Sequence, residues 1–150
     1  MVPEVRMITM GTPYTMPGLF PEGLTDNEFS LLTTCSKEAA GLTPQALLKQ
    51  ASGHLDKVRH AHAQNAFVNR RLAEAMVDIF KTVVSRWEDL PDPARPWLKG
   101  MIGYFALSTD LESDLTSPIG FDDDVAIMNA CLRLAGLDDL CLDPEDFDDL

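Results

Sequence analysis

The residues most able to do chemistry in this sequence are carboxylates gathered in one stretch, residues 104–128, which reads YFALSTDLESDLTSPIGFDDDVAIM. Four of its aspartates form two pairs, Asp110 with Asp114 and Asp123 with Asp124. If the first pair lies on a helix, its side chains share one face, because residues four apart are one turn apart. Hard divalent cations such as Mg²⁺ and Ca²⁺ prefer carboxylate oxygens. One hypothesis is therefore a divalent-metal-dependent activity at these four aspartates.

The same carboxylates also have a structural use, which the sequence favours over a metal site. Asp122 suits the N-cap of a following helix, and Asp123 and Asp124 in the first turn complement the helix dipole. Basic residues that offer ion pairs are Arg95, Lys99 and Arg133. The spacing differs from an EF-hand loop, whose ligands alternate and end with a glutamate at the twelfth position. The sequence therefore implies no obligate cofactor, and Mg²⁺ or Ca²⁺ is the group that it suggests.

The charge of the chain is concentrated at its carboxyl-terminal end. Residues 110–150 hold 13 acidic side chains and one basic side chain, whereas residues 1–109 hold 11 of each. The whole formal net charge of −12 therefore belongs to the last part of the chain. Nucleic-acid binding needs a cationic face that releases counterions, and docking on anionic lipid needs basic residues as well. The sequence argues against both functions.

A basic protein partner suits this distribution of charge. We name residues 110–124 the acidic hinge and residues 143–150 the acidic tail, and we expect both to contact such a partner. The predicted function is a non-enzymatic binding or regulatory domain, of which an inhibitor or immunity-type protein is one variant. The residues expected to bind the partner are Asp122, Asp143, Glu145, Asp146, Asp148 and Asp149.

Sequence motifs of catalysis are absent from the chain. It has no G-x-S-x-G elbow, no phosphate-binding glycine loop and no cysteine–histidine pattern. The histidines are His54, His60 and His62, and we expect all three to be solvated. His60 and His62 cannot share one ion on a regular helix, because residues two apart point in opposite directions. These observations favour a binding protein over an enzyme.

Three cysteines, Cys35, Cys131 and Cys141, are an odd number without the spacing of a zinc site. We expect small buried residues with reduced thiols, as is typical of cytoplasmic proteins. The amino-terminal residues lack the pattern of a signal peptide, and no stretch has the roughly 20 apolar residues of a membrane span. The sequence therefore predicts a cytoplasmic location.

Prolines and capping residues divide the chain into an extended N-terminal arm (1–24), a helical domain (25–142) and the acidic tail. Thr25 with Glu28 forms a capping box that starts a first helix, and Thr43-Pro44 starts a second. Apolar residues then recur every three or four positions as far as Leu90. If unbroken, this pattern makes a helix of about ten turns with a kink at residues 60–65.

A later helix should begin with Asp92 as its N-cap and carry Gly100 and Gly103, which let another backbone approach closely. The last helix should begin at Asp122 and end at Gly136. Together these signals predict an all-α fold, a single compact bundle of about five helices.

The acidic hinge also carries a family resemblance. Tyr104 lies in an apolar segment that is followed by D-L-E-S-D at residues 110–114 and by G-F-D-D-D at residues 120–124. This order resembles the YkvA-like family of small bacterial helical domains of uncharacterised function, with its P-I-D-L-I-P-D and G-Y-L-D-D segments. The chain retains four family-type aspartates and has serines in place of the two prolines. Over residues 92–134, the resemblance implies an all-helical fold but no reaction.

Overall fold

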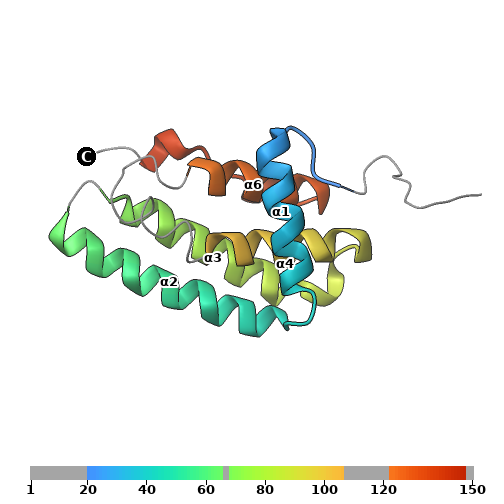
Figure 1. Ribbon diagram of the computed structural model, residues 1–150, viewed down its shortest axis with the longest axis horizontal. Helices are drawn as coiled ribbons and strands as arrows, with labels where there is room; N and C mark the ends of the chain where they lie inside the picture. Colours follow the sequence, from blue (N-terminus) through green and yellow to red (C-terminus); the bar gives the residue numbers. More distant parts are fainter. Residues whose placement is uncertain (1–19, 66–67, 107–121, 148–150) are drawn as a thin grey trace, which may run out of the picture.

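The computed structural model describes residues 20–65, 68–106 and 122–147, and these residues form a bundle of helices (Figure 1). Within these ranges the structure is all-α, as predicted, with five α-helices, short 3₁₀ turns and no strand. The α-helices are α1 (Asp26–Ala39), α2 (Pro44–Gln64), α3 (Arg70–Ser85), α4 (Arg95–Phe105) and α6 (Asp122–Leu134). The 3₁₀ turns are η1 (Trp87–Asp89), η2 (Asp92–Ala94), η4 (Asp138–Leu140) and η5 (Pro144–Phe147).

Helix α1 begins and ends with side-chain caps. The Glu28 amide donates to the Thr25 hydroxyl at 3.1 Å, and the Thr25 amide donates to the Glu28 carboxylate at 2.9 Å. The predicted capping box is confirmed. At the other end, the Lys99 ammonium on α4 donates to the Ala40 carbonyl at 3.3 Å. A cation at this position also suits the negative end of the helix dipole.

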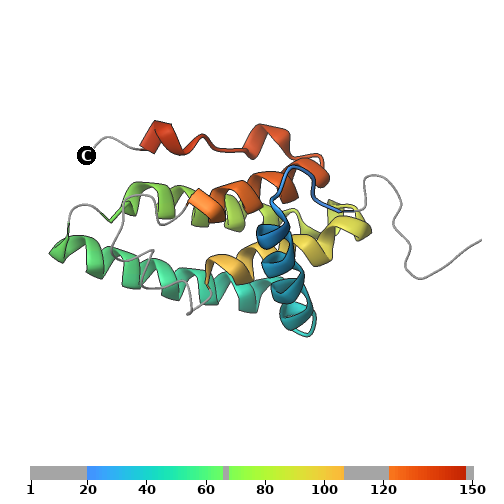
Figure 2. The same cartoon turned by 45° about the horizontal axis from the view of Figure 1, so that its top comes forward.

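Gly100 lets α1 cross closely over α4, which lies at the centre of the bundle. Helix α1 runs across the other helices in both views of the ribbon (Figures 1 and 2). A Cβ atom at Gly100 would lie 2.2 Å from the Ser36 hydroxyl and 3.1 Å from the Ser36 backbone nitrogen. The predicted close approach is therefore confirmed at Gly100. At Gly103 a Cβ atom would make only ordinary contacts, the nearest at 3.9 Å.

The long apolar pattern belongs to two helices rather than to one kinked helix. Helix α2 ends at Gln64 and α3 begins at Arg70, and the two lie side by side in opposite directions (Figures 1 and 2). The Leu72 amide donates to the Asn69 side chain at 3.1 Å, which caps α3. The expectation of a single kinked helix was wrong, because a capping asparagine and a buried Val68 allow the chain to reverse here.

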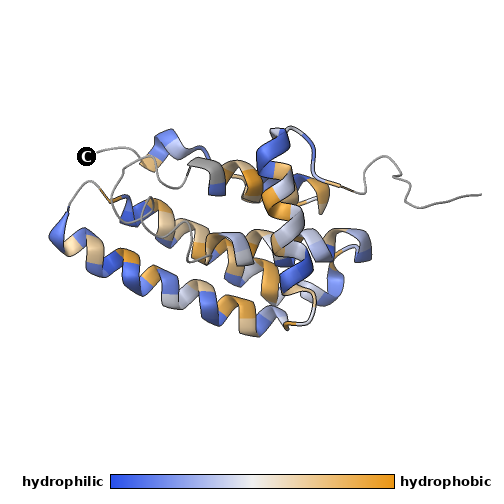
Figure 3. Cartoon of the chain, in the orientation of Figure 1, coloured by the Kyte–Doolittle hydropathy of each residue, from blue (hydrophilic) through white to orange (hydrophobic). Residues whose placement is uncertain are grey.

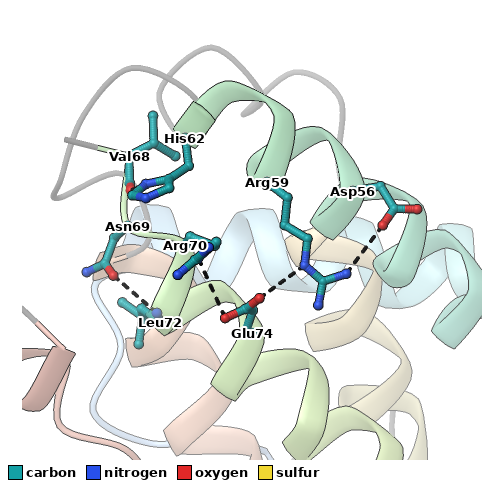
Figure 4. A network of polar contacts seen from close by, with 8 residues as sticks. All are labelled: Asp56, Arg59, His62, Val68, Asn69, Arg70, Leu72 and Glu74. Carbon is teal, nitrogen blue, oxygen red and sulfur yellow. Dashed lines mark hydrogen bonds and ion pairs between the residues drawn. The ribbon is translucent and has the colours of Figure 1, made fainter. Parts of the chain in front are cut away.

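Polar side chains hold the corner between α2 and α3 (Figure 4). His62 Nδ1 lies 2.9 Å from the Val68 carbonyl oxygen. The Arg59 guanidinium on α2 donates to the Glu74 carboxylate on α3 at 3.0 Å. Because this ion pair is partly exposed, it contributes at most about 1 kcal/mol. Glu74 therefore joins α3 to α2 at this corner.

The core lies between the helices, and apolar and polar residues alternate along α2 and α3 accordingly (Figure 3). Phe80 and Phe105 are fully buried and meet edge to face, with ring centroids 5.3 Å apart. His54 also packs edge to face against Phe105, at 5.1 Å, and is only 4% exposed. The prediction that all three histidines are solvated was therefore wrong for His54. Its ring takes part in the core instead.

Helix α4 begins later than its sequence suggested. Asp92 opens the short turn η2, and α4 itself begins at Arg95 without a side-chain cap. The Asp92 carboxylate pairs with the Arg95 guanidinium at 3.1 Å. Asp92, the expected N-cap, thus forms an ion pair with Arg95, the first residue of α4. Pro96 is tolerated because it lies in the first turn of α4, where a backbone donor is not needed.

Of the predicted N-terminal arm, residues 20–24 lie within the described ranges. The Phe20 ring meets the Phe29 ring edge to face, with centroids 6.2 Å apart. Phe29 in turn lies 5.5 Å from the Trp97 ring. This row of three aromatic rings joins the end of the arm to α1 and α4.

Candidate interaction surface

A tight turn at Gly136 directs the chain back along α6. Gly136 has a φ of 79°, a left-handed conformation that favours glycine. The Leu137 amide donates to the Leu132 carbonyl at 2.8 Å, and the Gly136 amide donates to the Arg133 carbonyl at 3.1 Å. These two bonds form a Schellman motif, which confirms the predicted end of the last helix.

After this turn, residues 137–147 form a segment that we name the C-terminal strap. It contains η4, a stretch without helical structure and η5, and it runs back beside α6 (Figures 1 and 2). Its apolar side chains Leu140, Leu142 and Phe147 are partly buried against the core. The first five residues of the predicted acidic tail therefore lie on the bundle, within the described ranges.

Asn129 on α6 binds the main chain of the strap. Its side-chain amide donates to the Leu142 carbonyl at 2.8 Å, and the Leu142 amide donates to its side-chain oxygen at 3.0 Å. The Cys141 thiol lies 3.6 Å from the Asn129 carbonyl oxygen, to which it is the donor. One asparagine thus satisfies both main-chain groups of Leu142. Sequence reasoning missed Asn129, because a single polar residue beside an apolar helix face gives no signal of its own.

The end of the strap lies against α3. The Arg71 guanidinium lies over the Phe147 ring, 5.7 Å from its centroid, within the range of a cation–π contact. Inside the strap, the Asp143 carboxylate accepts the Glu145 amide at 3.0 Å and opens η5. The strap is therefore held at two points, by its main chain at Leu142 and by its side chain at Phe147.

The acidic side chains of the strap are directed toward solvent. The predicted partner-binding residues Asp143, Glu145 and Asp146 are all exposed. Asp138 and Asp139 on η4 are exposed as well and extend the acidic surface, although the sequence did not single them out. The remaining predicted residues lie outside what the structure describes: Asp148 and Asp149 follow the described range, and the Asp122 side chain is not placed.

The four predicted metal ligands divide between described and undescribed residues. Asp124 on α6 is buried, with 2% of its surface exposed. Asp110 and Asp114 lie outside the described ranges, as does the Asp123 side chain. Among residues 20–65, 68–106 and 124–147, no three histidine, cysteine or carboxylate side chains form a group able to hold a metal ion. The described part of the chain thus places one of the four ligands and brings none together.

The buried Asp124 has an electrostatic effect on α1. Burial raises the pKa of the Cys35 thiol to about 11, with further contributions from the negative charges of Glu38 and Asp124. This effect places Asp124 near α1, and the two helices are in contact. The carboxylate therefore belongs to the contact between α1 and α6, and at neutral pH Cys35 is a protonated thiol.

All three cysteines are free thiols, as predicted. Cys35 and Cys131 are buried, and the Cys131 thiol lies 3.5 Å from the Trp97 carbonyl oxygen, to which it is the donor. Burial raises the pKa of Cys131 well above its ordinary value. Cys141, on the strap, is half-buried. Burial raises the pKa of Cys141 as well, against the opposite effect of Arg133.

The surface also has hollows outside the strap. One of about 450 Å³ lies between the start of α2 and the end of α3, beside Trp87, Glu88 and Asp89. Another of about 300 Å³ lies between Phe20 and the end of α6. Neither hollow gathers the predicted site residues.

None of the helices in the described ranges has both the length and the apolar character needed to cross a bilayer.

Comparison of the chain with family models, with curated proteins and with solved structures found no match. The likeness of residues 92–134 to the YkvA-like family therefore stays a prediction. The protein is defined by its fold and surface, as an all-α bundle that carries an acidic strap on one side.

Proposed function

We propose that this protein is a non-enzymatic binding domain that engages a basic protein partner through its C-terminal strap. The observation that carries the proposal is the exposure of five carboxylates on a segment whose main chain is held by Asn129. A charged surface that is already ordered loses little entropy when a partner binds. The three free thiols suit a reducing compartment, so we propose that the protein acts in the cytoplasm.

Electrostatics determine how such a surface recognises its partner. Opposite charges on two proteins speed their encounter and favour the correct orientation, and salt weakens both effects. A formal charge of −12 attracts a basic partner over roughly a Debye length, about 8 Å at physiological ionic strength. An inhibitor or immunity-type protein that covers a basic target is one form that this function takes.

The test begins with capture of partners from the native host, followed by affinity measurements with the purified partner. The variant Asp143→Asn/Glu145→Gln/Asp146→Asn removes three charges from the strap. The control Asp78→Asn/Glu88→Gln/Asp89→Asn removes three exposed charges from α3 and η1. We expect the strap variant to weaken binding at least tenfold in 150 mM salt, and the control to weaken it less than threefold. Equal losses, or an affinity that does not change with salt, would contradict the proposal.

A divalent-metal-dependent activity at Asp110, Asp114, Asp123 and Asp124 is the second candidate. Of these four, the structure places the carboxylate of Asp124, which is buried with 2% of its surface exposed, and carboxylate oxygens are the ligands that hard divalent cations prefer. Thermal melts with and without Mg²⁺, Ca²⁺ or Mn²⁺ test it directly. We expect one of these ions to raise the midpoint of the wild-type protein more than that of Asp124→Asn. Equal shifts in the two proteins exclude a site that depends on Asp124.

A further inference from the structure

The strap is bound to the bundle in the manner of a peptide. The Asn129 side chain pairs with the two main-chain groups of Leu142, and the Cys141 thiol of the strap donates to the Asn129 main-chain carbonyl. A side chain that pairs with both the amide and the carbonyl of one residue holds extended main chain whatever its sequence. Asn129 therefore anchors the main chain of the strap independently of the side chains that the strap carries.

The remaining contacts of the strap are modest. Its helical turns have three and four residues. Leu137, at its start, is buried in the core, but beyond it the apolar side chains Leu140, Leu142 and Phe147 are only partly buried. Its five carboxylates repel one another, and the basic side chains beside them are Arg71 at Phe147 and Arg133 near Cys141. Segments with few buried contacts and exposed hydrogen bonds open with less free energy than the core of a protein.

From these contacts we infer that the strap beyond Leu137 (residues 138–147) docks and releases as a unit without unfolding of the bundle, and that Asn129 is the positioning residue that holds it docked. The inference rests on the proposed function for its consequence: in the docked state the five carboxylates face a partner in a fixed arrangement. A partner that recognises this arrangement binds the docked state and shifts the population toward it. Its apparent affinity is lowered by the fraction of protein whose strap is released.

Cys141 provides a reporter of this release within the natural sequence. It is half-buried on the strap, and its thiol is the donor to the Asn129 carbonyl. Release removes this contact and exposes the sulfur, so that Cys141 reacts faster with a maleimide. Cys131 lies in the core and is 0% exposed, so its labelling reports the opening of the bundle itself. The two labelling rates therefore separate local release from global unfolding.

The experiment compares the full chain with Asn129→Ala, and with Asn27→Ala as a control at an exposed position on α1. Mass spectrometry follows maleimide labelling at pH 7.5. Because Asn129→Ala removes two hydrogen bonds, we expect Cys141 to react about 10- to 30-fold faster, with Cys131 unchanged. The control should label like wild type. An unchanged Cys141 rate in Asn129→Ala would overturn the role of Asn129.

Hydrogen exchange of the wild-type protein tests the separate release of the strap without any substitution. We expect the Leu142 amide to exchange at least tenfold faster than the central amides of α4 and α6. Exchange of Leu142 at the same rate as those amides would show that the strap opens only with the whole bundle, and would overturn the inference.

Partner binding then separates this inference from the proposed function. Asn129→Ala changes no charge, so a loss of affinity of about tenfold or more comes from the arrangement of the acids and supports both ideas. If Cys141 labels faster while affinity is unchanged, the strap releases as inferred and the proposed use of its docked surface fails. If Cys141 labelling is unchanged while neutralised acids still weaken binding, the proposed function stands and the inference fails.

Discussion

At the scale of single residues, Gly100 determines how closely α1 and α4 approach. A Cβ atom there would meet the Ser36 hydroxyl at 2.2 Å, and also the Ser36 backbone nitrogen, which cannot rotate away. Overpacking of this kind costs about 1–3 kcal/mol, against roughly 1 kcal/mol gained from the better helix propensity of alanine. We expect Gly100→Ala to lower the free energy of unfolding, by up to about 2 kcal/mol. Urea denaturation measures the change.

Gly53 provides the matched control within α2. It is exposed, and a Cβ atom at this position would meet no atom within 4 Å. Gly53→Ala should therefore raise the free energy of unfolding by about 0.5–1 kcal/mol, because only the propensity gain applies. If both substitutions change stability in the same direction, the close approach at Gly100 does not limit the packing of α1.

At the scale of elements, the features best predicted from the sequence are the helix ends, because each depends on a few neighbouring residues. Thr25 with Glu28, and Thr43 with Pro44, cap their helices through bonds within four residues, so their positions could be found from spacing alone. The left-handed Gly136 is a signal of the same local kind. The all-α fold follows from such local signals together with the apolar periodicity of the chain.

Contacts between distant residues could not be predicted in this way. The apolar pattern of α2 and α3 has the same period whether the chain continues or reverses, so the reversal after Gln64 was missed. The docking of the strap depends on a pairing between Asn129 and Leu142, thirteen residues apart, and on Phe147 beneath Arg71. For the same reason the sequence described residues 143–150 as a tail, with no position on the bundle.

The corner between α2 and α3 makes the reversal testable. Asn69 is 5% exposed and its side-chain oxygen accepts the Leu72 amide at 3.1 Å. Asn69→Ala leaves this amide without its acceptor, and we expect a loss of about 1–2 kcal/mol in the free energy of unfolding. Asn69→Ser, which keeps a capping oxygen, should recover most of the loss. Equal losses in the two variants would mean that Asn69 stabilises the corner through its packing.

At the scale of the whole molecule, the acids of the strap and two of the three thiols occupy different places. The acids of the strap are exposed at the surface, whereas Cys35 on α1 and Cys131 on α6 are buried, on two helices that both contact α4. Cooperative unfolding of the bundle exposes both thiols together. Ionisation of the two thiols at alkaline pH therefore changes the stability of the whole fold. At neutral pH the charge of the strap surface comes from its carboxylates instead.

The sign of this coupling follows from the direction of the pKa shifts. Burial raises the pKa of Cys35 from 9.0 to about 11 and raises that of Cys131 further. Between pH 9 and 11 the unfolded chain therefore loses thiol protons that the folded protein keeps. Stability that is fully present below pH 9 falls as the pH rises, by about 1 kcal/mol per pH unit for each thiol.

Urea denaturation at pH 8.0, 9.5 and 10.5 measures this loss in the wild-type protein and in Cys35→Ala/Cys131→Ala. Substitution lowers stability at pH 8.0, because two core atoms are removed. Lysines and tyrosines titrate in both proteins, so the difference in slope isolates the two thiols. We expect the variant to lose about 2–3 kcal/mol less than wild type between pH 8.0 and 10.5. Parallel slopes would show that Cys35 and Cys131 ionise as readily in the folded protein as in the unfolded chain, and that α1 and α6 do not shield them from water.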